Sequence, residues 1–177
     1  MLWSIAFDRL GVVVSDLYFV DPRPAEGQEG AERGVRLELR VFDREPLEGS
    51  IYSATPIRVD RPLWRVDLLE SVDSAPGSLD RAHHHPRFAG WEPGRRVFVE
   101  ELSAQPVGWL RERLADPAAV LVEAGENPAT HAADIAAQQA VAPLIAGTVE
   151  HLLAEVAAGR AGVAPDDAGD SVRASWL

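Results

Sequence analysis

Apolar and polar residues alternate along much of the first 70 residues, a pattern typical of strands with one buried face. The clearest case is 35–42, where apolar residues at the odd positions alternate with Arg36, Glu38 and Arg40. Similar runs predict further strands at 2–8, 12–20, 51–59 and 64–68. Because the links between them are short, we expect an antiparallel meander of about five strands.

The second half of the chain has the spacing of helices. Pro106 fits the first turn of a helix over 106–115, which Asp116-Pro117 would end. Asn127 is suited to capping a longer helix over 128–158, with Pro143 predicting a kink or a junction of two helices. The fold class is therefore predicted as α+β, with the sheet packed against a long kinked C-terminal helix and a shorter helix.

The length and the order of these elements favour one domain. Residues 1–160 would form a single α+β domain, with 1–100 mainly strands and loops and 101–160 mainly helical. Residues 161–177 are expected to be an irregular tail that ends in Trp176-Leu177. A homodimer formed through the helices or this tail is one interpretation of the chain.

Composition narrows the function classes. The chain of 177 residues has no Cys, which excludes thiolate metal sites, disulfides and a Cys nucleophile, and no Lys, which excludes Schiff-base chemistry. A net charge of −11 disfavours nucleic acid and anionic membranes as partners. The sequence has no unbroken run of about 18 apolar residues and no signal-peptide pattern at its start, so we expect a cytoplasmic location.

One short segment differs from the acidic remainder. Residues 81–96 carry four Arg against one Glu and hold three of the five His. In an extended segment His83 and His85 point the same way, which suits a divalent transition metal as cofactor. We expect His131 to be the third ligand, and Asp80, Glu92 and Asp134 are candidates for an oxygen ligand.

The same segment supports two other interpretations. Arg87, Trp91, Arg95 and Arg96 form a candidate ligand-binding group for a small anionic molecule, because Arg binds carboxylate or phosphate through paired hydrogen bonds. His84 is a candidate general acid or base, although the chain has no GxSxG motif. The simpler alternative is a polar loop with surface ion pairs worth about 0–1 kcal/mol each.

Two further polar surfaces follow from the predicted elements. The outer sheet face would carry Arg36, Glu38, Arg40, Arg58, Arg65 and Asp67, which either pair across strands or line a concave anion site. His131, Asp134 and Gln138 share one face of the long helix, which is either solvated or lines a cavity.

Three functions remain open at this stage. The first is the binding of a small anionic ligand through residues 81–96. The second is a small enzyme, with or without a metal, that uses the 83–85 histidines. The third is an interaction protein or homodimeric accessory protein.

Overall fold

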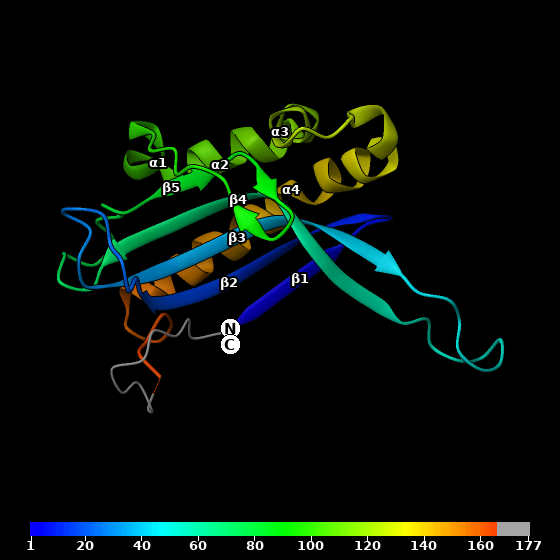
Figure 1. Ribbon diagram of the computed structural model, residues 1–177, viewed down its shortest axis with the longest axis horizontal. Coiled ribbons are helices and arrows are strands. Elements are labelled where there is room, and N and C mark those ends of the chain that lie inside the picture. The colour runs from blue at the N-terminus through cyan, green and yellow to red at the C-terminus, as the bar shows by residue number, and fades with distance from the viewer. Residues whose placement is uncertain (166–177) are drawn as a thin grey trace.

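The computed structural model describes residues 1–165 and has a five-stranded antiparallel sheet at its centre (Figure 1). The strands follow one another in sequence order: β1 Leu2–Ala6, β2 Leu10–Val20, β3 Ala31–Arg44, β4 Ile57–Ser71 and β5 His83–His85. The predicted meander is therefore confirmed. The predicted tail contact through Trp176 lies outside the described residues.

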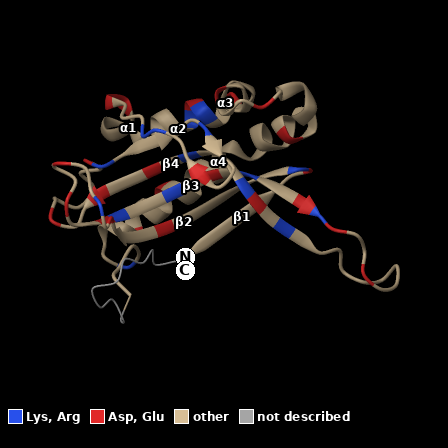
Figure 2. Cartoon of the chain, viewed as in Figure 1, with Lys and Arg blue, Asp and Glu red and all other residues tan. Residues whose placement is uncertain are grey.

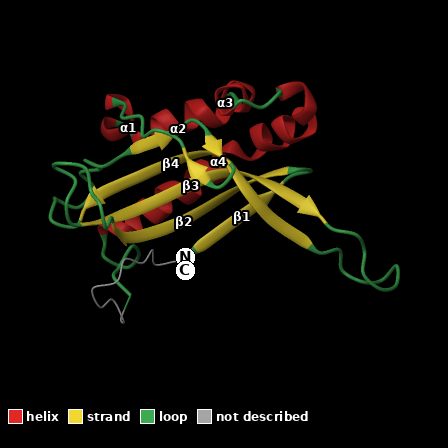
Figure 3. Ribbon diagram, in the orientation of Figure 1, coloured by secondary structure: helices red, strands yellow, loops and turns green. Residues whose placement is uncertain are grey.

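Within residues 1–165, helices cover one face of this sheet and leave the other, called the open face below, without a helix (Figure 3). They are α1 Glu100–Ala104, α2 Pro106–Ala115, α3 Pro117–Ala124, the 3-10 turn Pro128–His131 and α4 Ala132–Ala157. Helix α4 continues through Pro143 as one helix. By length and composition alone Pro128–Ala157 could cross a membrane, a property that it shares with core helices of soluble proteins.

The core lies between the sheet and the helices. Alternate residues of β2, β3 and β4 point toward the helices and are buried, among them Val12, Val14, Val35, Leu37, Leu39, Val66 and Leu68. Ile145, Val149 and Leu152 of α4 meet them at helical spacing. Each such side chain contributes about 1.5–3 kcal/mol on burial, so this layer holds the sheet rigid and fixes what its open face presents.

The strand boundaries correct part of the sequence prediction. No strand spans 51–59: β4 begins at Ile57 and runs on to Ser71, joining two predicted strands into one. Pro62 is tolerated inside β4 because the pairing with β3 is irregular there. The fifth strand is instead His83–His85, in the segment for which a polar loop is the simpler alternative from sequence.

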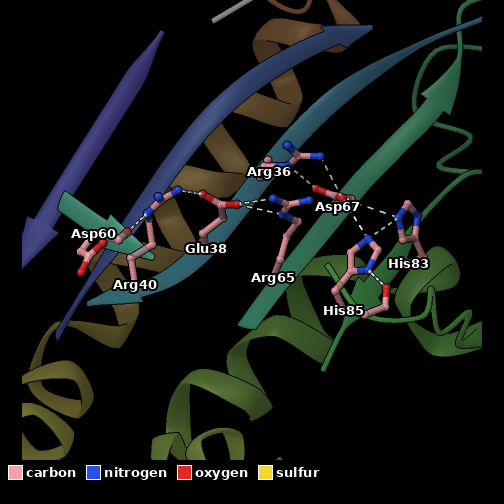
Figure 4. Close-up of polar contacts among 9 residues, drawn as sticks. Arg36, Glu38, Arg40, Asp60, Arg65, Asp67, His83 and His85 are labelled. Carbon is pink, nitrogen blue, oxygen red and sulfur yellow. Dashed lines mark hydrogen bonds and ion pairs between the residues drawn. The ribbon is translucent and has the colours of Figure 1, made fainter. Parts of the chain in front are cut away.

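Charged residues recur along β3 and β4 (Figure 2), and Figure 4 shows the side chains of Arg36, Glu38, Arg40, Arg65 and Asp67 on the open face. A small hairpin, β6 Phe88–Ala89 and β7 Glu92–Pro93, turns at Gly90 and Trp91 beside this face. Gly90 has a φ of 64°, as the first residue of a tight two-residue turn requires. The Phe88 ring lies 4.9 Å from the Arg65 guanidinium and the Trp91 ring lies 5.2 Å from that of Arg40.

Candidate metal centre on the open sheet face

Strand pairing brings three potential metal ligands together. In the antiparallel register of β4 and β5, Asp67 lies opposite His83 and Arg65 lies opposite His85. Successive side chains alternate between faces, so His83 and His85 share the open face with Asp67 (Figure 4). Among the described residues these three form a group whose ligand atoms all lie within 4.8 Å of one another.

Backbone carbonyls fix the orientation of both imidazole rings. Nδ1 of His83 lies 2.8 Å from the carbonyl oxygen of Arg81, and Nδ1 of His85 lies 2.8 Å from that of Gly94. A carbonyl oxygen only accepts hydrogen bonds, so each Nδ1 must carry the proton. In the neutral rings the lone pairs are then on the two Nε2 atoms, which lie 3.2 Å apart.

The Asp67 carboxylate completes the group. Its Oδ2 lies 3.5 Å from Nε2 of His83 and 3.7 Å from Nε2 of His85. Arg36 on β3 donates from Nε to Oδ1 at 2.6 Å and from Nη2 to Oδ2 at 3.1 Å. Both Asp67 oxygens are therefore held in place by a neighbouring strand.

Burial and charge set the protonation states. Burial alone would raise the pKa of the Asp67 carboxyl, but Arg36 outweighs it and brings the pKa down to about 2. Burial lowers the pKa of His85 to about 4 despite the nearby Asp67 charge, and it also lowers the pKa of His83. At neutral pH the site thus holds one carboxylate and two neutral imidazoles.

Three electron-donating atoms therefore face one another with no proton between them. Such atoms repel unless a cation lies among them. Four-coordinate zinc, with bonds of roughly 2.0–2.1 Å, places its ligand atoms about 3.3 Å apart. The distances of 3.2, 3.5 and 3.7 Å are close to that spacing, so small side-chain shifts would complete the coordination.

A row of alternating charges continues from this group across the sheet. Glu38 accepts from Arg65 Nε at 2.8 Å and from Arg40 Nη1 at 2.5 Å. Arg40 also donates from Nε to the carbonyl oxygen of Asp60 at 2.8 Å. The pairs Arg36–Asp67 and Glu38–Arg65 stand opposite each other in the register, which confirms the expected cross-strand pairing of opposite charges.

The structure gives His131 a different environment from the other proposed ligands. It is the last residue of the 3-10 turn, and its Nδ1 lies 3.5 Å from Oδ2 of Asp134. The other oxygen of Asp134 accepts from the backbone N–H groups of Asp8, Arg9 and Leu10. Asp134 and Gln138 are buried rather than solvated. His131 is not a member of the group formed by Asp67, His83 and His85.

His84 points to the helix-covered side, away from its two neighbours. Its ring lies 6.1 Å from that of Trp64 and 5.3 Å from that of Trp109. Burial lowers its pKa, and its Nδ1 has no hydrogen-bond partner within residues 1–165. The residue proposed as general acid or base is thus enclosed by aromatic rings on the opposite face.

The four residues of the candidate anion site contact separate parts of the fold. Arg87 donates to the carbonyl oxygen of Glu123 on α3. Arg96 donates to Gln28 and pairs with Asp21. Arg95 is exposed, and Trp91 lies at the hairpin turn over Arg40.

Asp67 is the potential ligand that sequence reasoning did not select. Of the expected oxygen ligands, Asp80 accepts hydrogen bonds from Ser74 and Ser78, and Glu92 is exposed in the hairpin. The alternation along 64–68 places Asp67 on the outer face. The sequence has no pattern that predicts the pairing of that strand with the histidine segment.

No protein-family model matches this chain, and comparison with curated proteins and with solved structures finds none that is similar.

Proposed function

We propose that this protein binds one divalent transition-metal ion through the Asp67 carboxylate and the Nε2 atoms of His83 and His85. The observation that carries the proposal is the fixed orientation of the two rings. Both Nδ1–H groups donate to backbone carbonyls, which directs both lone pairs toward Asp67. Metal-binding histidines in proteins are commonly oriented in this way by a second hydrogen bond.

The ligand set supports a reactive centre rather than a purely structural one. Structural zinc sites have four protein ligands, whereas catalytic sites have three and keep a position for water or substrate. Two histidines and one carboxylate suit zinc or non-haem iron(II). We therefore propose a small metal-dependent enzyme, in the cytoplasm, in which the ion holds and polarises the substrate or activates a bound water.

The surrounding charges favour an anionic substrate. Arg36 and Arg65 flank Asp67, and both are largely buried. Their positive charge lowers the affinity of the site for a bare cation and raises it for a cation that carries an anionic ligand. A small anionic molecule on the open coordination position would thus offset part of the excess positive charge. The homodimer alternative stays a prediction, to be tested by light scattering.

Metal content of the untagged protein tests the proposal. We expect one equivalent of a transition metal after purification or after dialysis against zinc, and its loss in His83→Gln and His85→Gln. His151→Gln, on the exposed side of α4, is the matched control and should retain the metal. These glutamine variants keep a polar side chain and should remain folded, which circular dichroism checks separately. Metal retained by both folded site variants, or absent from the wild type, would contradict the proposal.

A further inference from the structure

A cavity of about 360 Å³ opens on the same sheet face, beside the candidate metal centre. Its floor includes Arg36, Glu38 and Arg40 of β3, and its apolar lining includes Val13, Val59 and Trp91. Asp67, His83 and His85 are not part of this lining. The cavity is in the size range of small-molecule sites, which are mostly apolar with a few polar groups that fix orientation.

The polar floor retains hydrogen-bond donors. Arg36 uses Nε and Nη2 on Asp67, and Arg40 uses Nη1 on Glu38 and Nε on the Asp60 carbonyl. Within the described part of the chain, these bonds leave Nη1 of Arg36 and Nη2 of Arg40 for a ligand. Glu38, between them, already accepts from two guanidinium groups.

The charge on the floor favours an anion. Three guanidinium groups, those of Arg36, Arg40 and Arg65, face two carboxylates, those of Glu38 and Asp67 (Figure 4). One positive charge is therefore left over in a largely buried row. Arg36 and Arg40 are four residues apart on β3, about 13 Å at their Cα atoms, so one carboxylate reaches the donors of only one of them. Arg40 is the one that lies beside Trp91.

Two apolar residues that line the cavity are exposed to solvent. Trp91 is 59% exposed and Val59 is 42% exposed. Trp91 is held at a tight turn, and Arg40 lies over its ring at 5.2 Å. A large aromatic side chain fixed beside a cavity, with most of its surface in water, is typical of a ligand-contacting residue.

We propose that this cavity binds a small aromatic carboxylate. The carboxylate accepts a hydrogen bond from Arg40, and the aromatic ring lies against Trp91 and the two valines. This inference does not rest on the proposed metal function, because no metal ligand lines the cavity. Failure of either proposal is therefore distinguishable from failure of the other.

Isothermal titration calorimetry with 2-naphthoate, in the presence of a metal chelator, tests the inference. We expect one binding site per chain, and at least about tenfold weaker binding of the neutral 2-naphthamide, which loses a charge-assisted pair. Absence of naphthoate binding up to about 10 mM would overturn the proposal. Equal affinity for the amide would overturn the assignment of an anion.

Two variants locate the site. Trp91→Ala removes an exposed ring at a turn, so the fold should persist while naphthoate affinity falls at least about tenfold. Trp3→Ala is the matched control. Trp3 is also exposed, but its side chain points to the sheet face opposite to that of its neighbours Leu2 and Ser4, which line the cavity. Unchanged affinity in Trp91→Ala, or an equal loss in both variants, would place the binding elsewhere and contradict the inference.

Discussion

Asp134 is expected to be the residue on α4 whose loss costs the most stability. It is 3% exposed, and its Oδ1 accepts from the backbone N–H groups of Asp8, Arg9 and Leu10 at 3.0, 2.9 and 2.9 Å. One carboxylate oxygen thus holds the tight turn between β1 and β2 against the start of the helix. Asp134→Ala removes the acceptor without crowding the site.

The magnitude follows from the burial of the three donors. The Leu10 N–H is buried, and leaving it unpaired costs roughly 2 kcal/mol. The Asp8 and Arg9 donors are part-buried and regain water, so each costs about 0.5–1 kcal/mol. We expect Asp134→Ala to lower the free energy of unfolding by about 3 kcal/mol. Asp134→Asn keeps an acceptor oxygen and should lose about 1 kcal/mol.

Urea denaturation followed by circular dichroism measures both variants. Glu150→Ala is the control on the same helix, because its ion pair with Arg111 is 61% exposed on both sides and contributes little. A loss below about 1 kcal/mol for Asp134→Ala, or equal losses for the Ala and Asn variants, would refute the reasoning.

Three further predictions concern Arg36 and His85 on the open face and His84 on the helix-covered face. Arg36→Met leaves Asp67 buried without its partner and should lower the free energy of unfolding by about 3–5 kcal/mol. Arg36→Met combined with Asp67→Leu should unfold with a free energy within about 1 kcal/mol of wild type, and urea denaturation measures both variants. The pKa of His85 is about 4 in the folded chain against its ordinary value of 6.5, so only the unfolded chain takes up this proton as the pH falls from 6.5 to 4. The metal-free protein should then lose up to about 3 kcal/mol across that window, and His85→Gln should flatten the dependence; an unchanged slope would contradict the assignment. His84→Phe removes a buried polar atom without a partner in the described region and should retain wild-type thermal stability and metal content; loss of metal there would restore His84 as a site residue.

Strict alternation made part of the open face predictable. Arg36, Glu38 and Arg40 lie on one side of β3 because apolar residues at the odd positions must face the helices. The same rule assigned Arg65 and Asp67 to the outer face. The opposed charges then followed from antiparallel pairing alone.

The candidate site itself needed information that periodicity does not carry. His83–His85 has no apolar pattern, so nothing indicated that this segment pairs with β4. Helix spacing placed His131 on one face with Asp134 and Gln138, but it does not predict where the start of the helix lies relative to the sheet. Asp134 binds the turn after β1, and this contact fixes that position.

The helix boundaries also divide into those that local sequence predicts and those that it does not. Proline and asparagine at the first turn marked α2 and the turn before α4, because each residue acts locally. Residues 120–122 are an apolar run too short to assign from the pattern, which also fits an edge strand. They belong to α3, which Asp116 caps by accepting from Ala119. A run of that length does not distinguish a strand from a helix.

The location of a bound ion tests the central claim most directly. Crystals of the untagged protein grown with zinc, measured at the zinc absorption edge, reveal the ion by anomalous scattering. We predict one peak roughly 2.0–2.2 Å from Nε2 of His83, Nε2 of His85 and an oxygen of Asp67. The absence of a peak at this position, or a peak only at His131 or His151, would contradict the account.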